Sequence, residues 1–287
     1  MVVLRCLAEA DRAGLDGFLD RHRASSMFLR SNLFHAGLND GTGRYQGLYA
    51  GRFVDGDMTD VAAHYWNGNI ILQAPDAPRD LAEYLIAQSG RPVSGALGPW
   101  AQVQAAEPHL PLDRGRLGKV VPEYLYSLSI AEMKTPDILG SGDVFVRRAA
   151  KQDLPTLVAW RRIYDRITMG FPEHAINDDR NAEMFRGMIA DDRLWVLEEN
   201  GTPMAMTAFN ATLPDTVQVG GVFTCEAARG KGYALAAVAG SLLSAQGGGV
   251  RTAILFTEVT NVPAQKAYEA LGFARVGDYG MVVLDPE

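Results

Sequence analysis

The hexapeptide "RGKGYA", Arg229 to Ala234, places two glycines and two basic side chains where a strand-like run, "TVQVGGVFT", gives way to a helix-like run, "LAAVAGSLLSAQ". The first N–H groups of a helix have no intrahelical partner and carry partial positive charge. Glycines let a bulky ligand approach the backbone, and Arg229 and Lys231 add charge at the same place. The pattern predicts a phosphate or pyrophosphate site, although Gly-Lys-Gly is also compatible with a simple flexible turn.

One interpretation of this loop is the dinucleotide fingerprint G-x-G-x-x-G/A. Gly230 and Gly232 match its first two glycines, but Leu235 stands at its third position. Five residues, "CEAAR", separate the strand from the loop, and the preceding segments are typical of antiparallel hairpins rather than of a βαβ unit. Glu258 ends the next strand at a distance that the fingerprint tolerates. An NAD(P)-binding oxidoreductase therefore stays a less favoured alternative.

A second interpretation comes from a resemblance. The segment "VGGVFTCEAARGKGYALAAVAGSLL" resembles the acetyl-CoA-binding segment of the GNAT acyltransferase superfamily, whose pattern matches at Arg229, Gly232 and Ala234. A second family segment, "TNVPAQKAYEALGF", follows at the expected interval. The resemblance extends from Val144 to Leu284 and is closest in style to predicted bacterial acetyltransferases. The residues that carry the second segment are Asn261, Ala264, Tyr268, Gly272 and Phe273.

This resemblance implies an α/β fold with a mixed, mostly antiparallel central sheet flanked by helices. It also implies an acyl-CoA-dependent N-acyltransferase of class EC 2.3.1, with acetyl-CoA as cosubstrate and no metal. The acetyl group would pass by direct attack to the primary amine of a small molecule or a peptide. The implied cofactor-binding residues are Val222, Phe223, Thr224, Arg229, Gly230, Lys231, Gly232, Tyr233, Ala234, Asn261 and Tyr268.

The resemblance also suggests a mechanism. The strands "VGGVFT" and "AILFTEV" are expected to run parallel and to separate, so that the pantetheine arm pairs with the first strand. A backbone N–H near Val222 or Phe223 would hold the thioester oxygen. Tyr268 is the candidate proton donor to the departing thiolate. Glu258 is a candidate base acting through water, or else a satisfied polar residue at a strand end, because the family's usual carboxylate position holds Gln218.

Composition excludes several other classes. The chain of 287 residues has a formal net charge of −7 and a pI of about 5.3, which argues against a non-specific nucleic-acid binder. No apolar run is long enough to span a membrane, and we expect a cytoplasmic protein. The two cysteines and five histidines fit no metal spacing, and Cys225 has no evident partner that would make it a nucleophile.

The chain echoes itself coarsely, which predicts two tandem GNAT-like domains. We expect a degenerate domain at 1–135, a linker at 131–143 and the catalytic domain at 143–287. In the first half, "QAPDAPRDLAEYL" has prolines and aspartates where a phosphate loop needs glycines and a base, so this copy is expected not to bind CoA. Its "HYWNGN" and "FLRSNLFHAGL" segments either line the acceptor pocket or consist of packing aromatic residues and polar loop residues. A non-catalytic CoA-binding or sensing protein stays an alternative, and the sequence does not predict the oligomeric state.

Overall fold

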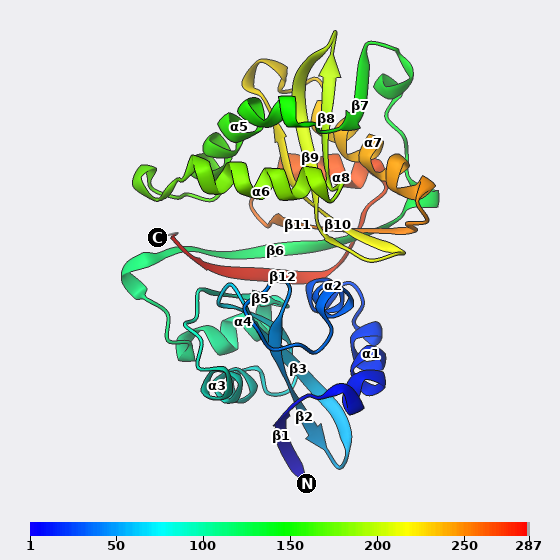
Figure 1. Ribbon diagram of the computed structural model, residues 1–287. Coiled ribbons are helices and arrows are strands. Elements are labelled where there is room, and N and C mark those ends of the chain that lie inside the picture. Colours follow the sequence, from blue (N-terminus) through cyan, green and yellow to red (C-terminus); the bar gives the residue numbers. More distant parts are fainter. Residues whose placement is uncertain (286–287) are drawn as a thin grey trace. The chain divides into compact units, whose positions relative to one another are not determined.

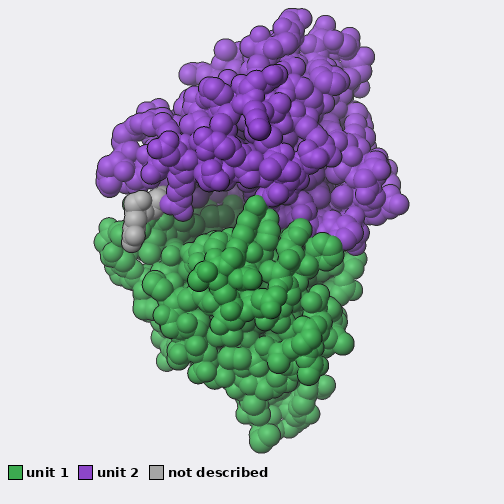
Figure 2. Space-filling view, viewed as in Figure 1, with its two compact units in different colours: residues 1–125, 276–285 green, residues 126–275, 286–287 purple. Residues whose placement is uncertain are grey.

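The computed structural model describes residues 1–285 and divides into two compact units, drawn in different colours in Figure 2. Unit 1 comprises Met1–Leu125 with Val276–Asp285, and unit 2 comprises Tyr126–Arg275. The last strand is thus grouped with the N-terminal half, whereas the predicted ranges 1–135 and 143–287 assign it to the C-terminal domain. Those ranges stay a prediction about sequence domains, and the units describe how the chain is packed.

In the sheet of unit 1, the pairs β1–β2, β2–β3, β3–β4 and β5–β12 are antiparallel. The strand order is β1-β2-β3-β4-β5-β12-β6, and β4 and β5 run parallel. β12 pairs with β5 from Gly280↔Gly98 to Val283↔Gly95, so the C-terminal strand completes the sheet of the first unit. The strands are β1 (Val2–Cys6), β2 (Gly47–Val54), β3 (Asp57–Tyr65), β4 (Asn69–Gln73), β5 (Gly95–Gly98), β6 (Leu117–Ser129) and β12 (Ala274–Leu284).

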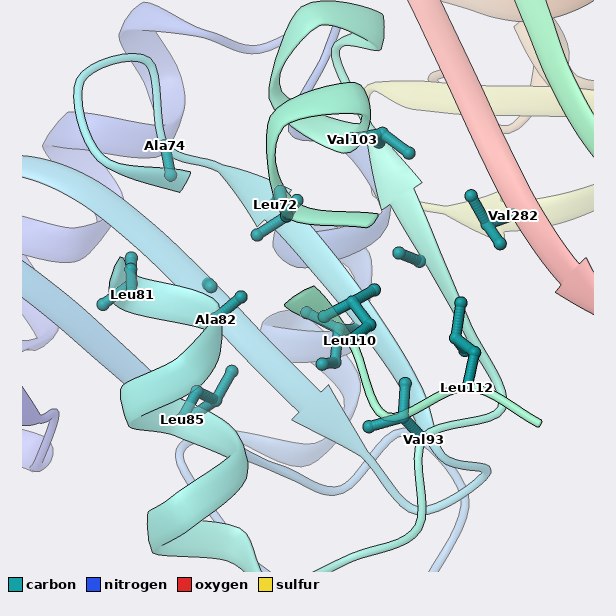
Figure 3. Packing of buried hydrophobic residues seen from close by; sticks show 14 of the residues in the cluster. Leu72, Ala74, Leu81, Ala82, Leu85, Val93, Val103, Leu110, Leu112 and Val282 are labelled. Carbon is teal, nitrogen blue, oxygen red and sulfur yellow. The ribbon is translucent and has the colours of Figure 1, made fainter. Parts of the chain in front are cut away.

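Helices cover both faces of this sheet because successive strand residues point to opposite sides. On β3, Val61 packs with α1 and α2, while the next residue, Ala62, packs with α3 and α4. Figure 3 shows the second of these cores, in which Leu81 and Leu85 of α3 lie near Leu72 of β4. The helices of unit 1 are α1 (Arg12–Arg21), α2 (Met27–Ala36), α3 (Pro78–Ser89) and α4 (Trp100–Ala106).

Unit 2 repeats this plan. Its strand order is β11-β10-β9-β8-β7, antiparallel except for the parallel pair β10 and β11 (Figure 1). Val196 of β8 packs with α5 and α6, and the neighbouring Leu197 packs with α7 on the other face. The strands are β7 (Val144–Arg148), β8 (Leu194–Glu199), β9 (Thr202–Thr212), β10 (Thr216–Thr224) and β11 (Thr252–Glu258). The helices are α5 (Leu154–Ile167), α6 (Asp178–Ala190), α7 (Tyr233–Gly247) and α8 (Val262–Leu271).

The predicted fold class, a mixed and mostly antiparallel sheet flanked by helices, is therefore confirmed. Both halves run strand, two helices, three strands, helix, strand, helix, strand. The echo extends to side chains, because Arg5 binds Asp11 in the first half as Arg147 binds Asp153 in the second, six residues apart in each case. The two halves thus share an arginine and an aspartate at the same spacing, which form the same ion pair in each.

Candidate functional site

The parallel strands β10 and β11 separate part of the way along their length. Their ladder extends from Thr216↔Thr252 to Val219↔Leu255 and then ends, although β10 continues to Thr224. Beyond Val219, β10 keeps β9 as a neighbour but no longer pairs with β11. Backbone groups on that edge of β10 are therefore available to an extended ligand. The predicted separation of the two strands is confirmed.

A β-bulge with two glycines lies at the point of separation. The register of β10 against β9 shifts between Gly220 and Phe223, so that two β10 residues face one residue of β9. A Cβ on Gly220 would collide with the side-chain amide of Asn210, and Gly221 has φ +61°. Gly221 thus provides a positive φ that other residues rarely adopt, whereas at Gly220 the exposed Asn210 side chain could move aside. The bulge reorients the backbone at Val222 and Phe223, the residues predicted to face the thioester.

The loop between β10 and α7 has the backbone geometry of an anion site. After a short 3-10 turn, η8 (Glu226–Ala228), Gly230 and Gly232 adopt φ +77° and +79°. Gly232 is the N-cap residue of α7 and offers no side chain to its free N–H groups. A Cβ on either glycine would meet nothing within 4 Å, and Arg229 to Gly232 are exposed. The N-terminus of α7 is therefore both uncapped and accessible.

Glu199, at the end of β8, joins this loop through two contacts. It accepts a hydrogen bond from the hydroxyl of Tyr233, and its Oε2 lies 3.8 Å from Nζ of Lys231. The hydrogen bond to Glu199 raises the pKa of Tyr233 to about 12. Lys231 also lies over the Tyr233 ring, with Nζ 5.6 Å from the ring centroid. The sequence contains no local signal for Glu199, which lies some thirty residues before the loop that it contacts.

Helix α8 places the second predicted segment. The side chain of Asn261 caps the helix by accepting from the N–H of Ala264 at 3.2 Å. Seven residues after Asn261, Tyr268 is half-buried, and its ring centroid lies 6.0 Å from that of Phe273. Burial raises the pKa of Tyr268, and the neighbouring Tyr164 of α5 adds to the shift. Its phenol is therefore neutral and able to donate a hydrogen bond.

The two candidate base positions differ in what they offer. Glu258 ends β11, and its backbone oxygen accepts from the N–H of Asn261 and from Nε2 of Gln265. Its carboxylate stays a predicted base. Gln218 is 2% exposed and donates to the backbone oxygen of Val219, while its Oε1 is buried without a hydrogen bond. An amide has no useful basicity, so Gln218 does not replace a carboxylate base.

The equivalent joint in unit 1 is closed by the chain itself. Only four residues connect β4 to α3, against eight between β10 and α7. The carboxylate of Asp60 accepts from the N–H groups of Asp76 and Ala77 at 2.8 and 3.0 Å, just where α3 begins. Oε1 of Gln102 accepts from the N–H of Ala74, directly after β4, at 2.6 Å. Side chains thus satisfy three backbone donors at this joint. Among the described residues of unit 2, no side chain caps the N-terminus of α7, although the N–H of Cys225, directly after β10, donates to the backbone oxygen of Met204.

Two negative findings apply to residues 1–285. No cluster of three or more histidine, cysteine, aspartate or glutamate side chains in this part of the chain could hold a metal ion. Over the same residues, no helix combines the length and the apolar character needed to cross a membrane.

The comparisons with known proteins agree with this geometry. Residues 157–273 match the model of the Acetyltransferase (GNAT) family, and this range contains every predicted site residue from Val222 to Tyr268. A search of curated proteins finds no match. Among solved structures, the chain is similar over its whole length to a Drosophila protein, with 12% identity, a TM-score of 0.66 and complete coverage of both chains.

Two further solved structures share the fold. A GCN5-related N-acetyltransferase from Sphaerobacter thermophilus is 13% identical, with a TM-score of 0.57 and coverage of 98% of this chain and 94% of that one. A tandem GNAT protein from the clavulanic acid biosynthesis pathway is 10% identical, with a TM-score of 0.54 and complete coverage of both chains. At these identities the likeness concerns the fold, and it extends over both halves.

Proposed function

We propose that the protein is an acyl-CoA-dependent N-acyltransferase that moves an acetyl group from acetyl-CoA to a primary amine. The match of residues 157–273 to the GNAT acetyltransferase family model supports this proposal. The observation that carries this proposal is the combination, within unit 2, of a separated strand pair and an uncapped helix N-terminus at the next joint. A strand edge suits the amides of a pantetheine arm, and the N-terminus of α7 suits a diphosphate.

In this proposal the chain binds the cosubstrate with its backbone. The N–H groups around Gly230, Gly232 and Tyr233 hold the diphosphate, and Arg229 adds charge. The bulge at Gly220 and Gly221 presents an N–H near Val222 or Phe223 to the thioester oxygen, where negative charge develops during attack. Mutations that remove one such donor cost about 100- to 1000-fold in turnover in other acyl-transfer enzymes.

The proposed chemistry is a direct transfer. The amine nitrogen forms a bond to the thioester carbonyl carbon, the carbon–sulfur bond breaks, and the proton released from nitrogen ends on the CoA thiol. A thiol has a pKa of about 8.5, below the raised pKa of Tyr268, so full proton transfer from the phenol is unfavourable. Tyr268 instead stabilises the thiolate by donating a hydrogen bond, until the proton from the amine arrives.

The amine must reach the carbonyl in its neutral form. An alkyl ammonium group has a pKa of about 10, so a base is needed near neutral pH. Glu258, acting through water, is our candidate, since Gln218 carries no titratable group. The acceptor class in this proposal is a primary amine on a small molecule or a peptide.

Unit 1 is proposed to be a copy that no longer binds CoA. The support is direct, because Asp60 and Gln102 occupy the N–H groups that a ligand would need, and Pro78 in the first turn of α3 has no N–H to offer. The acidic Asp76 and Asp80 beside that turn would also repel a diphosphate. We therefore expect one CoA site per chain.

The test combines binding and turnover. Isothermal titration of the full chain with acetyl-CoA should give a stoichiometry of one, and release of free CoA thiol should accelerate when amines are added one by one. Stabilisation by NAD(P) but not by acetyl-CoA in a thermal-shift measurement would exclude the proposal in favour of the oxidoreductase.

A second candidate function is a CoA-binding or sensing protein without catalysis. The buried, uncharged Gln218 favours it, because it removes the family's usual base. This candidate predicts acetyl-CoA affinity equal to that of an enzyme, with no thiol release above the rate without protein for any amine tested.

A further inference from the structure

The loop proposed to bind the diphosphate contacts a negatively charged side chain of the same chain, Glu199. Glu199 is fixed by the hydroxyl of Tyr233, the first residue of α7, and forms an ion pair with Lys231 in the Gly-Lys-Gly bend. The Glu199 side chain is 26% exposed and that of Lys231 is 50% exposed. Asp143 is a second acidic neighbour, close enough to contribute to the raised pKa of Tyr233.

We propose that Glu199 is an internal counter-ion of this loop, which holds Lys231 when no ligand is bound and thereby lowers the affinity for CoA. The proposal rests on the proposed function, since it assumes that the loop receives the diphosphate. Arg229 keeps its charge for the ligand, whereas Lys231 changes partner from Glu199 to a phosphate oxygen. Glu199 is thus an affinity-determining residue and not a catalytic one.

The two contacts of Glu199 differ in strength and therefore in role. A half-exposed ion pair at 3.8 Å is weak, because water and salt screen it, so Lys231 is easily released. The bond from Tyr233 is charge-assisted and involves a residue that is almost wholly buried. The carboxylate therefore stays beside the loop after Lys231 has left, and its charge opposes that of the bound phosphates.

The variant Glu199→Gln separates charge from anchoring. Its amide oxygen can still accept the hydrogen bond from Tyr233, but the negative charge is gone. Coulomb repulsion between unit charges several ångströms apart near a protein surface predicts that the dissociation constant for CoA falls by about 3- to 10-fold at low salt. The gain should shrink towards zero at about 1 M salt, where the screening length is about 3 Å.

The experiment measures CoA binding to the full chain by isothermal titration at low and high salt. Glu183→Gln on α6, whose side chain is 79% exposed, removes the same charge from another surface and should leave the dissociation constant unchanged. In a Lys231→Gln background the gain from Glu199→Gln should become smaller, because Lys231 is then no longer available to the ligand.

The outcomes are distinct. Tighter binding by Glu199→Gln that is sensitive to salt supports the counter-ion role. Unchanged or weaker binding by this variant, with normal binding by the wild-type chain, overturns it and makes Glu199 a simple anchor of the loop. If the wild-type chain fails to bind CoA, the proposed function itself is refuted.

Discussion

Replacing Gly232 tests the loop most directly, because the structure separates two effects of a side chain there. Gly232 has φ +79°, which strains any other residue, and the space beside it is empty, so a Cβ meets nothing within 4 Å. Gly232→Ala therefore adds strain without collision. Gly232→Trp adds the same strain and also fills the space in which we propose that the diphosphate lies.

The strain can be given a magnitude. A left-handed conformation costs a non-glycine residue about 1–2 kcal/mol. For a domain of the size of unit 2, each kcal/mol lowers the Tm by about 2–4 °C, so both variants should melt about 2–8 °C below the wild type. Since this strain is present with and without ligand, Gly232→Ala should keep CoA affinity within about 10-fold. Gly232→Trp should weaken it by at least about 100-fold, because contacts to a charged phosphate are lost.

Thermal melting and CoA titration of the same samples provide the assay. Gly249→Trp is a matched control, because Gly249 also has positive φ, at +101°, and lies beyond the other end of α7 with its nearest neighbour at 3.9 Å. It should lose stability but bind CoA normally. Wild-type affinity in Gly232→Trp would refute the assignment of the loop, and an unchanged Tm in Gly232→Ala would refute the strain argument.

Three further predictions concern other residues. Tyr268→Phe should lower kcat by about 10- to 1000-fold with CoA affinity nearly unchanged, and equal rates in both proteins would remove Tyr268 from the mechanism. In the wild type the raised pKa keeps the phenol of Tyr268 protonated, so kcat should show no alkaline loss from this residue below pH 10. Asp60→Ala should lower the free energy of unfolding by about 3 kcal/mol, since Arg52 and two N–H groups lose a buried partner, while CoA affinity and stoichiometry stay the same; a changed affinity or a second bound CoA per chain would contradict the proposal that unit 1 binds none. Cys225→Ser should retain activity, because direct transfer needs no thiol nucleophile, and complete loss of thiol release would indicate an acyl-enzyme.

The sequence by itself determined the features that depend on neighbouring residues. Glycine at 230 and 232 permits the left-handed backbone that this loop adopts, and Asn200-Gly201 forms the turn between β8 and β9 with φ +51° and +76°. Asn261 caps α8 through a bond to a residue three positions later. The glycines and the basic residues predicted the anion loop from local backbone geometry, whereas the fold class and the strand separation were implied by the resemblance of these segments to a known family.

Only the tertiary structure decided which distant groups meet at these places. Nothing near Lys231 in the sequence indicates that Glu199 neutralises it, and nothing near α3 indicates that Asp60 and Gln102 satisfy the N–H groups of that joint. The grouping of the last strand with unit 1 is likewise set by its pairing with β5. Such contacts depend on which strands become neighbours in the sheet, a property that hydrophobic pattern and turn chemistry leave open, since they fix the face of a residue but not its partner.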